Sequence, residues 1–142
     1  MPTTRKASTH WEGNLLQGNG TVALESSGLG SYAVSWPART EEAADGRTSP
    51  EELIAAAHSS CFSMAFSHAL DQAGTPPTRL DTTAEVTFQP GKGITGVHLT
   101  VRGEVPGLDR EQFAAAAEDA KKKCPVSQAL AGTTITLSAE LA

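Results

Sequence analysis

Several features that would mark a specialised class of protein are missing from this sequence. The net charge is −5, and only Lys121–Lys123 forms a run of one sign, so the basic face needed for binding nucleic acid is absent. No apolar stretch follows the basic residues near the start, so we expect no secretory signal and a cytoplasmic location. Internal repeats and low-complexity segments are absent. The composition is 39% hydrophobic and 19% charged, which is typical of an ordinary globular protein, and we expect one domain over residues 1–142.

A long uninterrupted hydrophobic run is also missing. The most apolar stretch, Leu53–Leu70, is broken by serines and by His58 and His68. A bilayer span needs about 20 mostly apolar residues. We therefore interpret the stretch as a buried helix and expect no membrane partner.

Cysteine is scarce, since Cys61 and Cys124 are the only two in the chain. In a reducing compartment such a pair is seldom a permanent structural disulfide, and metal ligands or catalytic thiols are the usual roles. Cys61 and Cys124 are therefore candidates for metal binding or for catalysis.

Three segments alternate apolar and polar residues with period two, which is typical of half-buried strands. They are Leu80–Gln89, Val97–Arg102 and Thr134–Leu141, and Pro90–Gly93 is placed to join the first two as a hairpin. Weaker patterns predict short strands within His10–Leu16, around Val22 and Leu24, and over Tyr32–Trp36. A polar surface loop is expected over Thr40–Thr48.

Two helices have clear start and stop signals. Ser49, Pro50 and Glu52 form a predicted capping box for a helix that runs to about Ala73 and stops at Gly74. A second box, Asp109 with Gln112, starts a helix that Pro125 ends. The predicted fold is α+β, with two helices packed on an antiparallel sheet.

The first predicted helix is apolar or small on nearly every side, so it must be covered on most sides. One sheet covers only one side of a helix. The second helix or another subunit must supply the rest, and the many alanines and serines would allow a close approach. We infer a homodimer with these long helices at its centre.

Each cysteine has a reactive and an inert interpretation. Cys61, in the middle of the first helix, is either an inert core residue or a thiol activated by a fixed cation, for which Arg39 is the nearest candidate. Cys124 either just terminates a helix or sits beside lysines at the start of a short helix beginning at Pro125, where a thiolate is favoured. Zinc held by both cysteines and His58 is a third option, but no fourth ligand is evident. A packing or hydrogen-bonding role suits His58 better.

Glu51 and Glu52 differ in what they can do. Glu52 completes the capping box, whereas Glu51 has no structural role beyond favouring the start of the helix. Ten helical residues rise about 15 Å, so Glu51 is far from Cys61 of its own chain. It could approach Cys61 of a partner if the helices cross antiparallel. If Arg39 and Glu51 lie near that thiol, the three residues form a functional site. Otherwise Arg39 and Glu51 are two solvated charges.

Taken together, several short motifs resemble the family of osmotically inducible protein C and organic hydroperoxide resistance proteins, and the match extends over essentially the whole chain. The motifs are His10-Trp11-Glu12-Gly13, Ser49-Pro50-Glu51-Glu52-Leu53-Ile54-Ala55-Ala56-Ala57-His58, Cys61-Phe62-Ser63-Met64, Leu80-Asp81-Thr82-Thr83-Ala84 and Cys124-Pro125-Val126-Ser127. Each motif alone is weak, but the ordered set is specific. Ala57-His58 and Val126 look more like the OsmC branch than the Ohr branch.

The resemblance implies an intertwined homodimer with peroxidase activity that needs no metal, haem or flavin. It implies that Cys61 is the peroxidatic thiolate, Cys124 the resolving thiol, Arg39 the activating guanidinium and Glu51 the carboxylate that orients it. Arg47 is a possible substitute for Arg39. An outside thiol would reduce the resulting disulfide, and an apolar lining from Phe62, Met64 and Phe66 would favour organic peroxides.

Two other functional classes stay open on the sequence alone. A small-molecule or lipid-binding stress protein would use the apolar helix interface as a pocket, with incidental cysteines. A structural dimer with a regulatory disulfide would consume peroxide only once per chain.

Overall fold

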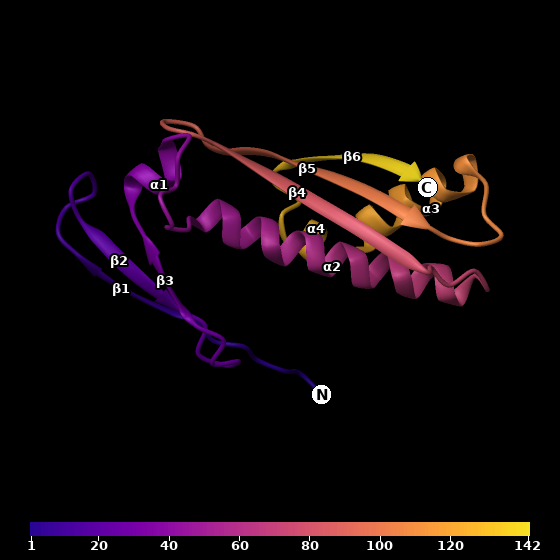
Figure 1. Cartoon of the computed structure of the whole chain (residues 1–142), viewed down its shortest axis with the longest axis horizontal. Helices are drawn as coiled ribbons and strands as arrows, with labels where there is room; N and C mark the ends of the chain where they lie inside the picture. Colours follow the sequence, from indigo (N-terminus) through magenta and orange to yellow (C-terminus); the bar gives the residue numbers. More distant parts are fainter. The chain divides into compact units, whose positions relative to one another are not determined.

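A computed structural model describes all residues, 1–142, and the chain forms two compact units, Met1–Pro50 and Glu51–Ala142 (Figure 1). The smaller unit holds three strands and one short helix, and the larger holds three strands and three helices.

The amino-terminal unit is an antiparallel sheet in the order β1-β2-β3. Its strands are β1 (Ser8–Glu12), β2 (Asn19–Ala23) and β3 (Ser31–Val34), so the weak strand patterns are confirmed with shifted ends. Trp36 was expected to continue the last strand, and this is wrong. It begins the short helix α1 (Trp36–Thr40), because Ser35 caps the helix by accepting a 3.2 Å hydrogen bond from the N–H of Ala38, and proline stands in its first turn.

The carboxy-terminal unit contains the second sheet, in the order β4-β5-β6. The strands β4 (Arg79–Gln89) and β5 (Gly93–Glu104) form the predicted antiparallel hairpin. The expectation of a purely antiparallel sheet is wrong, because β6 (Thr134–Leu141) pairs with β5 in parallel. The chain crosses over between these strands through two helices, α3 (Arg110–Lys123) and α4 (Pro125–Ala129), and such a crossover lets the next strand enter in the same direction.

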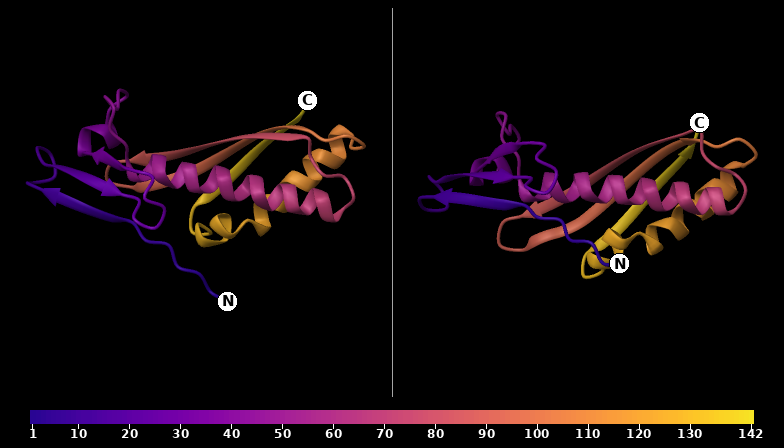
Figure 2. Two further views of the ribbon diagram at one scale, coloured as in Figure 1. Left: turned by 60° about the horizontal axis from the view of Figure 1, so that its bottom comes forward. Right: turned by 90° about the horizontal axis from the view of Figure 1, so that it is seen from below.

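Helix α2 (Pro50–Gln72) and α3 lie on the same side of this sheet (Figure 2). The side chains that alternate to the other side of its strands are polar and mostly exposed. The core between helices and sheet is made of Phe62, Phe66 and Leu70 from α2, Leu99 and Val101 from β5, and Phe113, Ala117 and Ala120 from α3. The capping box of Asp109 and Gln112 is present at the start of α3, as predicted. These contacts fix where the carboxy-terminal part of α2 lies against β5 and α3.

The side of α2 that faces away from this core is exposed within the chain. Its exposed residues include Ala56, Ser60, Met64 and His68, and Met64 is 71% exposed. The buried residues of the carboxy-terminal part of α2 recur every four positions from His58 to Leu70, so a single stripe is covered. None of the helices combines the length and the hydrophobicity that a membrane span requires.

Candidate active site

Cys61 lies in the middle of α2, at the edge of the buried stripe. It is half-buried, and it packs against the hydrophobic core of the carboxy-terminal unit. Cys61 is thus a partly buried neighbour of the core, and whether it is inert or reactive stays a prediction.

Cys124 is the junction between α3 and α4 and is completely buried, with 0% of its surface exposed. Its N–H donates to the carbonyl of Ala120 in α3, and its carbonyl accepts from the N–H of Gln128 in α4. Pro125 occupies the first turn of α4. The predicted position of Cys124 at the start of a short helix is confirmed.

The fold brings the two thiols together, and both are free cysteines. Burial raises the pKa of Cys61 above its ordinary value, a hydrogen bond from the backbone N–H of Val126 lowers it, and the adjacent Cys124 side chain raises it further. Two thiols that interact so closely resist the ionisation of one another because a like charge nearby disfavours a second. A thiolate at Cys61 therefore needs further stabilisation.

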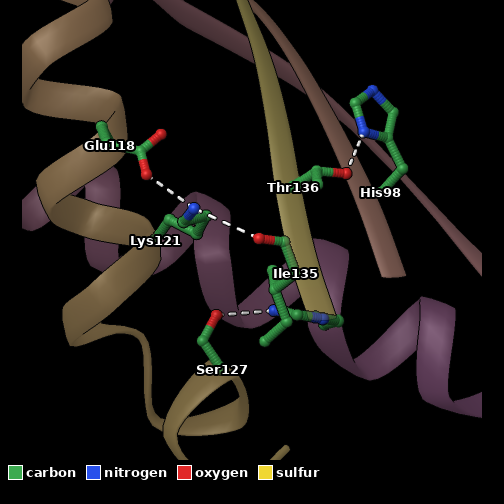
Figure 3. Close-up of polar contacts among 7 residues, drawn as sticks. His98, Glu118, Lys121, Ser127, Ile135 and Thr136 are labelled. Carbon is green, nitrogen blue, oxygen red and sulfur yellow. Dashed lines mark hydrogen bonds and ion pairs between the residues drawn. The ribbon is translucent and has the colours of Figure 1, made fainter. Parts of the chain in front are cut away.

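A second polar contact joins the same two helices beside the cysteines. The ring of His58 on α2 is 0% exposed, and its Nε2 lies 2.7 Å from the Oγ of Ser127 on α4. Figure 3 shows Ser127 and this hydrogen bond. The expectation of a packing or hydrogen-bonding role for His58 is confirmed, whereas Ser127 was part of the Cys124-Pro125-Val126-Ser127 motif but had no predicted role of its own.

Glu51 is buried, with 6% exposure, in the first turn of α2. The helix is unbroken between Glu51 and Cys61, so the two residues of one chain are separated by about 15 Å of helix rise. The carboxylate and the thiols therefore do not meet within this unit.

The two candidate arginines belong to the amino-terminal unit and have different surroundings there. The guanidinium of Arg39 in α1 lies 5.9 Å from the centre of the Trp36 ring, which is within range of a cation–π interaction. Arg47 donates a 3.1 Å hydrogen bond to the Oγ of Ser35, the residue that caps α1. Arg47 therefore has a structural role of its own.

Two of the three lysines before Cys124 form ion pairs with carboxylates of α3. Lys121 forms an ion pair with Glu118 at 2.6 Å and donates to the carbonyl of Ile135 (Figure 3). Lys123 pairs with Asp119. The contacts of Lys121 tie the end of α3 to the start of β6.

No group of three or more histidine, cysteine, aspartate or glutamate side chains is arranged to hold a metal ion. The zinc site with His58 as a third ligand is therefore not supported. An apolar lining built jointly from Phe62, Met64 and Phe66 is not present within the chain either, because the two phenylalanines are in the core and Met64 is exposed on the other side of α2.

A family model described as OsmC-like protein matches residues 43–138, a segment that includes both cysteines, His58 and Glu51. The chain belongs to the OsmC-like protein family. A relative named peroxiredoxin OsmC from Escherichia coli is 42% identical over 144 residues, which cover 99% of each chain. A protein of the same name from Shigella flexneri matches to the same extent.

Solved structures of OsmC and related proteins have the same fold over the full length. A crystal structure of an organic hydroperoxide resistance protein OsmC from Legionella pneumophila is 25% identical and covers 98% of this chain and 99% of its own, with a TM-score of 0.71. An organic hydroperoxide resistance protein from Elizabethkingia anophelis is 26% identical with complete coverage of both chains and a TM-score of 0.72. The sequence resemblance to the OsmC family is thus confirmed.

Proposed function

We propose that this OsmC-like protein is a thiol peroxidase that reduces organic hydroperoxides and hydrogen peroxide. The observation that carries the proposal is the placement of the Cys61 thiol beside the Cys124 side chain within one compact unit. The names of the relatives, peroxiredoxin and organic hydroperoxide resistance protein, support the same class of substrate.

The proposed reaction uses the two sulfur atoms in sequence. The Cys61 thiolate attacks the outer oxygen of the peroxide, the O–O bond breaks, and the leaving oxygen takes a proton and departs as alcohol or water. Cys61 becomes a sulfenic acid, which the Cys124 thiol attacks to form an S–S bond and release water. An external thiol or dithiol then returns two electrons and two protons.

Activation of Cys61 requires a cation, because burial and the adjacent Cys124 raise the pKa of the Cys61 thiol. We assign this role to Arg39, with Glu51 orienting it, following the resemblance to the OsmC family. A guanidinium is always charged and its planar fork can hold a thiolate and a peroxide together. Arg47 is the weaker choice, since it already donates to the cap of α1.

Cofactors and partners follow from the same proposal. The two thiols supply the electrons, so no metal, haem or flavin is needed.

We propose a homodimer that covers the exposed side of α2, whose small residues and 71% exposed Met64 would suit close helix packing. Sedimentation velocity tests this: the wild type should sediment as a dimer and Met64→Glu as a weaker dimer or a monomer.

Stopped-flow consumption of cumene hydroperoxide and hydrogen peroxide, with a dithiol reductant, tests the function. The wild type should turn over repeatedly, Cys61→Ser should lose all turnover, and Cys124→Ser should react once or slowly. Equal rates in the three proteins would refute the assignment. Retained binding of an apolar ligand by an inactive wild type would favour a binding protein instead.

A further inference from the structure

Helices α2 and α4 meet through two polar contacts that are one helical turn apart. On α2, His58 precedes Cys61 by three residues, and across the contact Cys124 precedes Ser127 by three residues. His58 contacts Ser127, and Cys61 contacts Cys124 together with the N–H of Val126. The thiol pair and the His58–Ser127 pair therefore belong to one interface between α2 and α4.

The His58 ring depends on Ser127 for its position. Its Nδ1 is buried and has no hydrogen-bond partner, so the Nε2 contact is the one polar interaction of the ring. A buried N–H without an acceptor is costlier than an unused lone pair, which favours the tautomer that donates from Nε2 to the Ser127 Oγ. Burial lowers the pKa of His58 and keeps the ring neutral.

Helix α4 needs such a contact to hold its place. It has five residues, and no side chain caps its start. A helix this short is not stable by itself, so its position is determined by what it packs against. Cys124 is the residue at which α4 begins, and any shift of α4 moves its sulfur relative to Cys61.

We propose that the His58–Ser127 hydrogen bond is a positioning device for the disulfide: it holds the first turn of α4 against α2 so that Cys124 lies ready beside Cys61. Preorganised groups react with a high effective concentration, and loosening them lowers it. The redox consequence deepens the proposed peroxidase function, but the positioning itself can be measured without peroxide.

The primary measurement is the equilibrium of the full-length protein with a glutathione buffer. Two thiols of the protein give two electrons and two protons to glutathione disulfide, forming the Cys61–Cys124 bond and two molecules of glutathione. Ser127→Ala removes the hydroxyl without adding bulk. We expect its equilibrium constant for disulfide formation to fall about threefold to tenfold, the range that one hydrogen bond supports.

The chain offers a matched control on the same helix. Ser63, two residues after Cys61, donates its hydroxyl proton to the carbonyl of Ser59 and accepts a hydrogen bond of the same length as the His58–Ser127 contact, 2.7 Å, from the hydroxyl of Thr82 on β4. Ser63→Ala therefore removes an equivalent contact of α2 that does not reach α4, and its equilibrium constant should stay close to the wild-type value. Ser127→Thr keeps the hydroxyl and should restore the wild-type equilibrium.

Step-resolved kinetics separate positioning from general damage. In Ser127→Ala the first-order closure of the disulfide should slow more than the second-order reaction of Cys61 with peroxide, so that more sulfenic acid is trapped by dimedone. A merely structural role would lower the unfolding temperature without changing the ratio of these rates. If Ser127→Ala does not fold, His58→Gln is measured in the same way.

The outcomes are distinct. The positioning role would be overturned if Ser127→Ala kept the wild-type equilibrium constant for disulfide formation. It would also be overturned if Ser63→Ala lowered that constant as much as Ser127→Ala does. Both outcomes hold whether or not the protein reduces peroxide. A selective loss in Ser127→Ala in a protein that consumes no peroxide would uphold the positioning role and refute the peroxidase function.

Discussion

Cys61 in the middle of α2 and Cys124 at the junction of α3 and α4 lie side by side in one compact unit, although they are distant along the chain. The hydrogen bond from the backbone N–H of Val126 to Cys61 holds the start of α4 at the same place. The chemistry proposed for this OsmC-like protein depends on that adjacency.

The first prediction concerns the titration of Cys61. Burial is the largest cause of its raised pKa and the adjacent Cys124 adds to it, so Cys124→Ala should lower the pKa of Cys61 without restoring the ordinary value. The rate of alkylation by iodoacetamide, measured against pH, should therefore have a lower midpoint in the variant. Cys124→Ser keeps a hydrogen-bonding group but no ionisable thiol. An identical midpoint in all three proteins would mean that the thiols do not interact.

The second prediction concerns which thiol meets outside reagents. Cys124 is 0% exposed and Cys61 is half-buried, so external thiols and disulfides should attack Cys61. With Ellman's reagent, the single thiol of Cys124→Ser should react faster than that of Cys61→Ser, and mixed disulfides should be recovered on Cys61. Faster labelling of Cys124 would show that α4 opens more readily than its burial indicates.

The third prediction is a loss of stability in acid that His58 causes. Its pKa is lowered in the folded protein by burial, so the unfolded state binds the proton first as the pH falls below about 6.5. The free energy of unfolding should then decrease with falling pH, by at most about 1.4 kcal/mol per pH unit from this group. Comparing urea denaturation at pH 7.5 and 5.5 should show a smaller difference in His58→Gln. Equal differences in both proteins would contradict the prediction.

The fourth prediction tests the core between β5 and the helices. A Cβ on Gly103 would lie 2.7 Å from the Phe113 ring and 2.9 Å from a methyl group of Leu80. Gly103→Ala should therefore cost about 1–3 kcal/mol of unfolding free energy through overpacking. Gly96, on the same strand, is the matched control, because its Cβ would meet only a carbonyl oxygen at 3.4 Å. A similar loss in both variants would indicate a general effect of removing glycine from β5.

Local patterns in the sequence predict much of this fold. Alternation with period two finds β4, β5 and β6, and the box of Asp109 and Gln112 finds the start of α3, since both signals depend on residues close in the chain. The direction of β6 was predicted wrongly. A helical segment between two strands is typical of a crossover that joins parallel strands, and this pattern was present in the sequence. The short helix α1 was missed, even though Ser35 and Pro37 repeat the cap signal read at Ser49 and Pro50.

The candidate site was only partly predictable, because its contacts join residues far apart in the chain. The proximity of Cys61 and Cys124 followed from the family resemblance, and nothing in their spacing requires it. Ser127 became a candidate only when the fold placed it 2.7 Å from His58. The roles of Arg39 and Glu51 stay predictions, and substituting Arg39 by lysine, which keeps the charge but loses the planar fork, is their direct kinetic test.

The central claim, that the two sulfur atoms can bond as soon as the first is oxidised, is tested most directly by mass spectrometry after one equivalent of cumene hydroperoxide. The account predicts stoichiometric formation of a Cys61–Cys124 disulfide within one chain, with unmodified Cys61 recovered after addition of a dithiol. A stable sulfenic acid at Cys61 with a free Cys124, or disulfides only between chains, would contradict it.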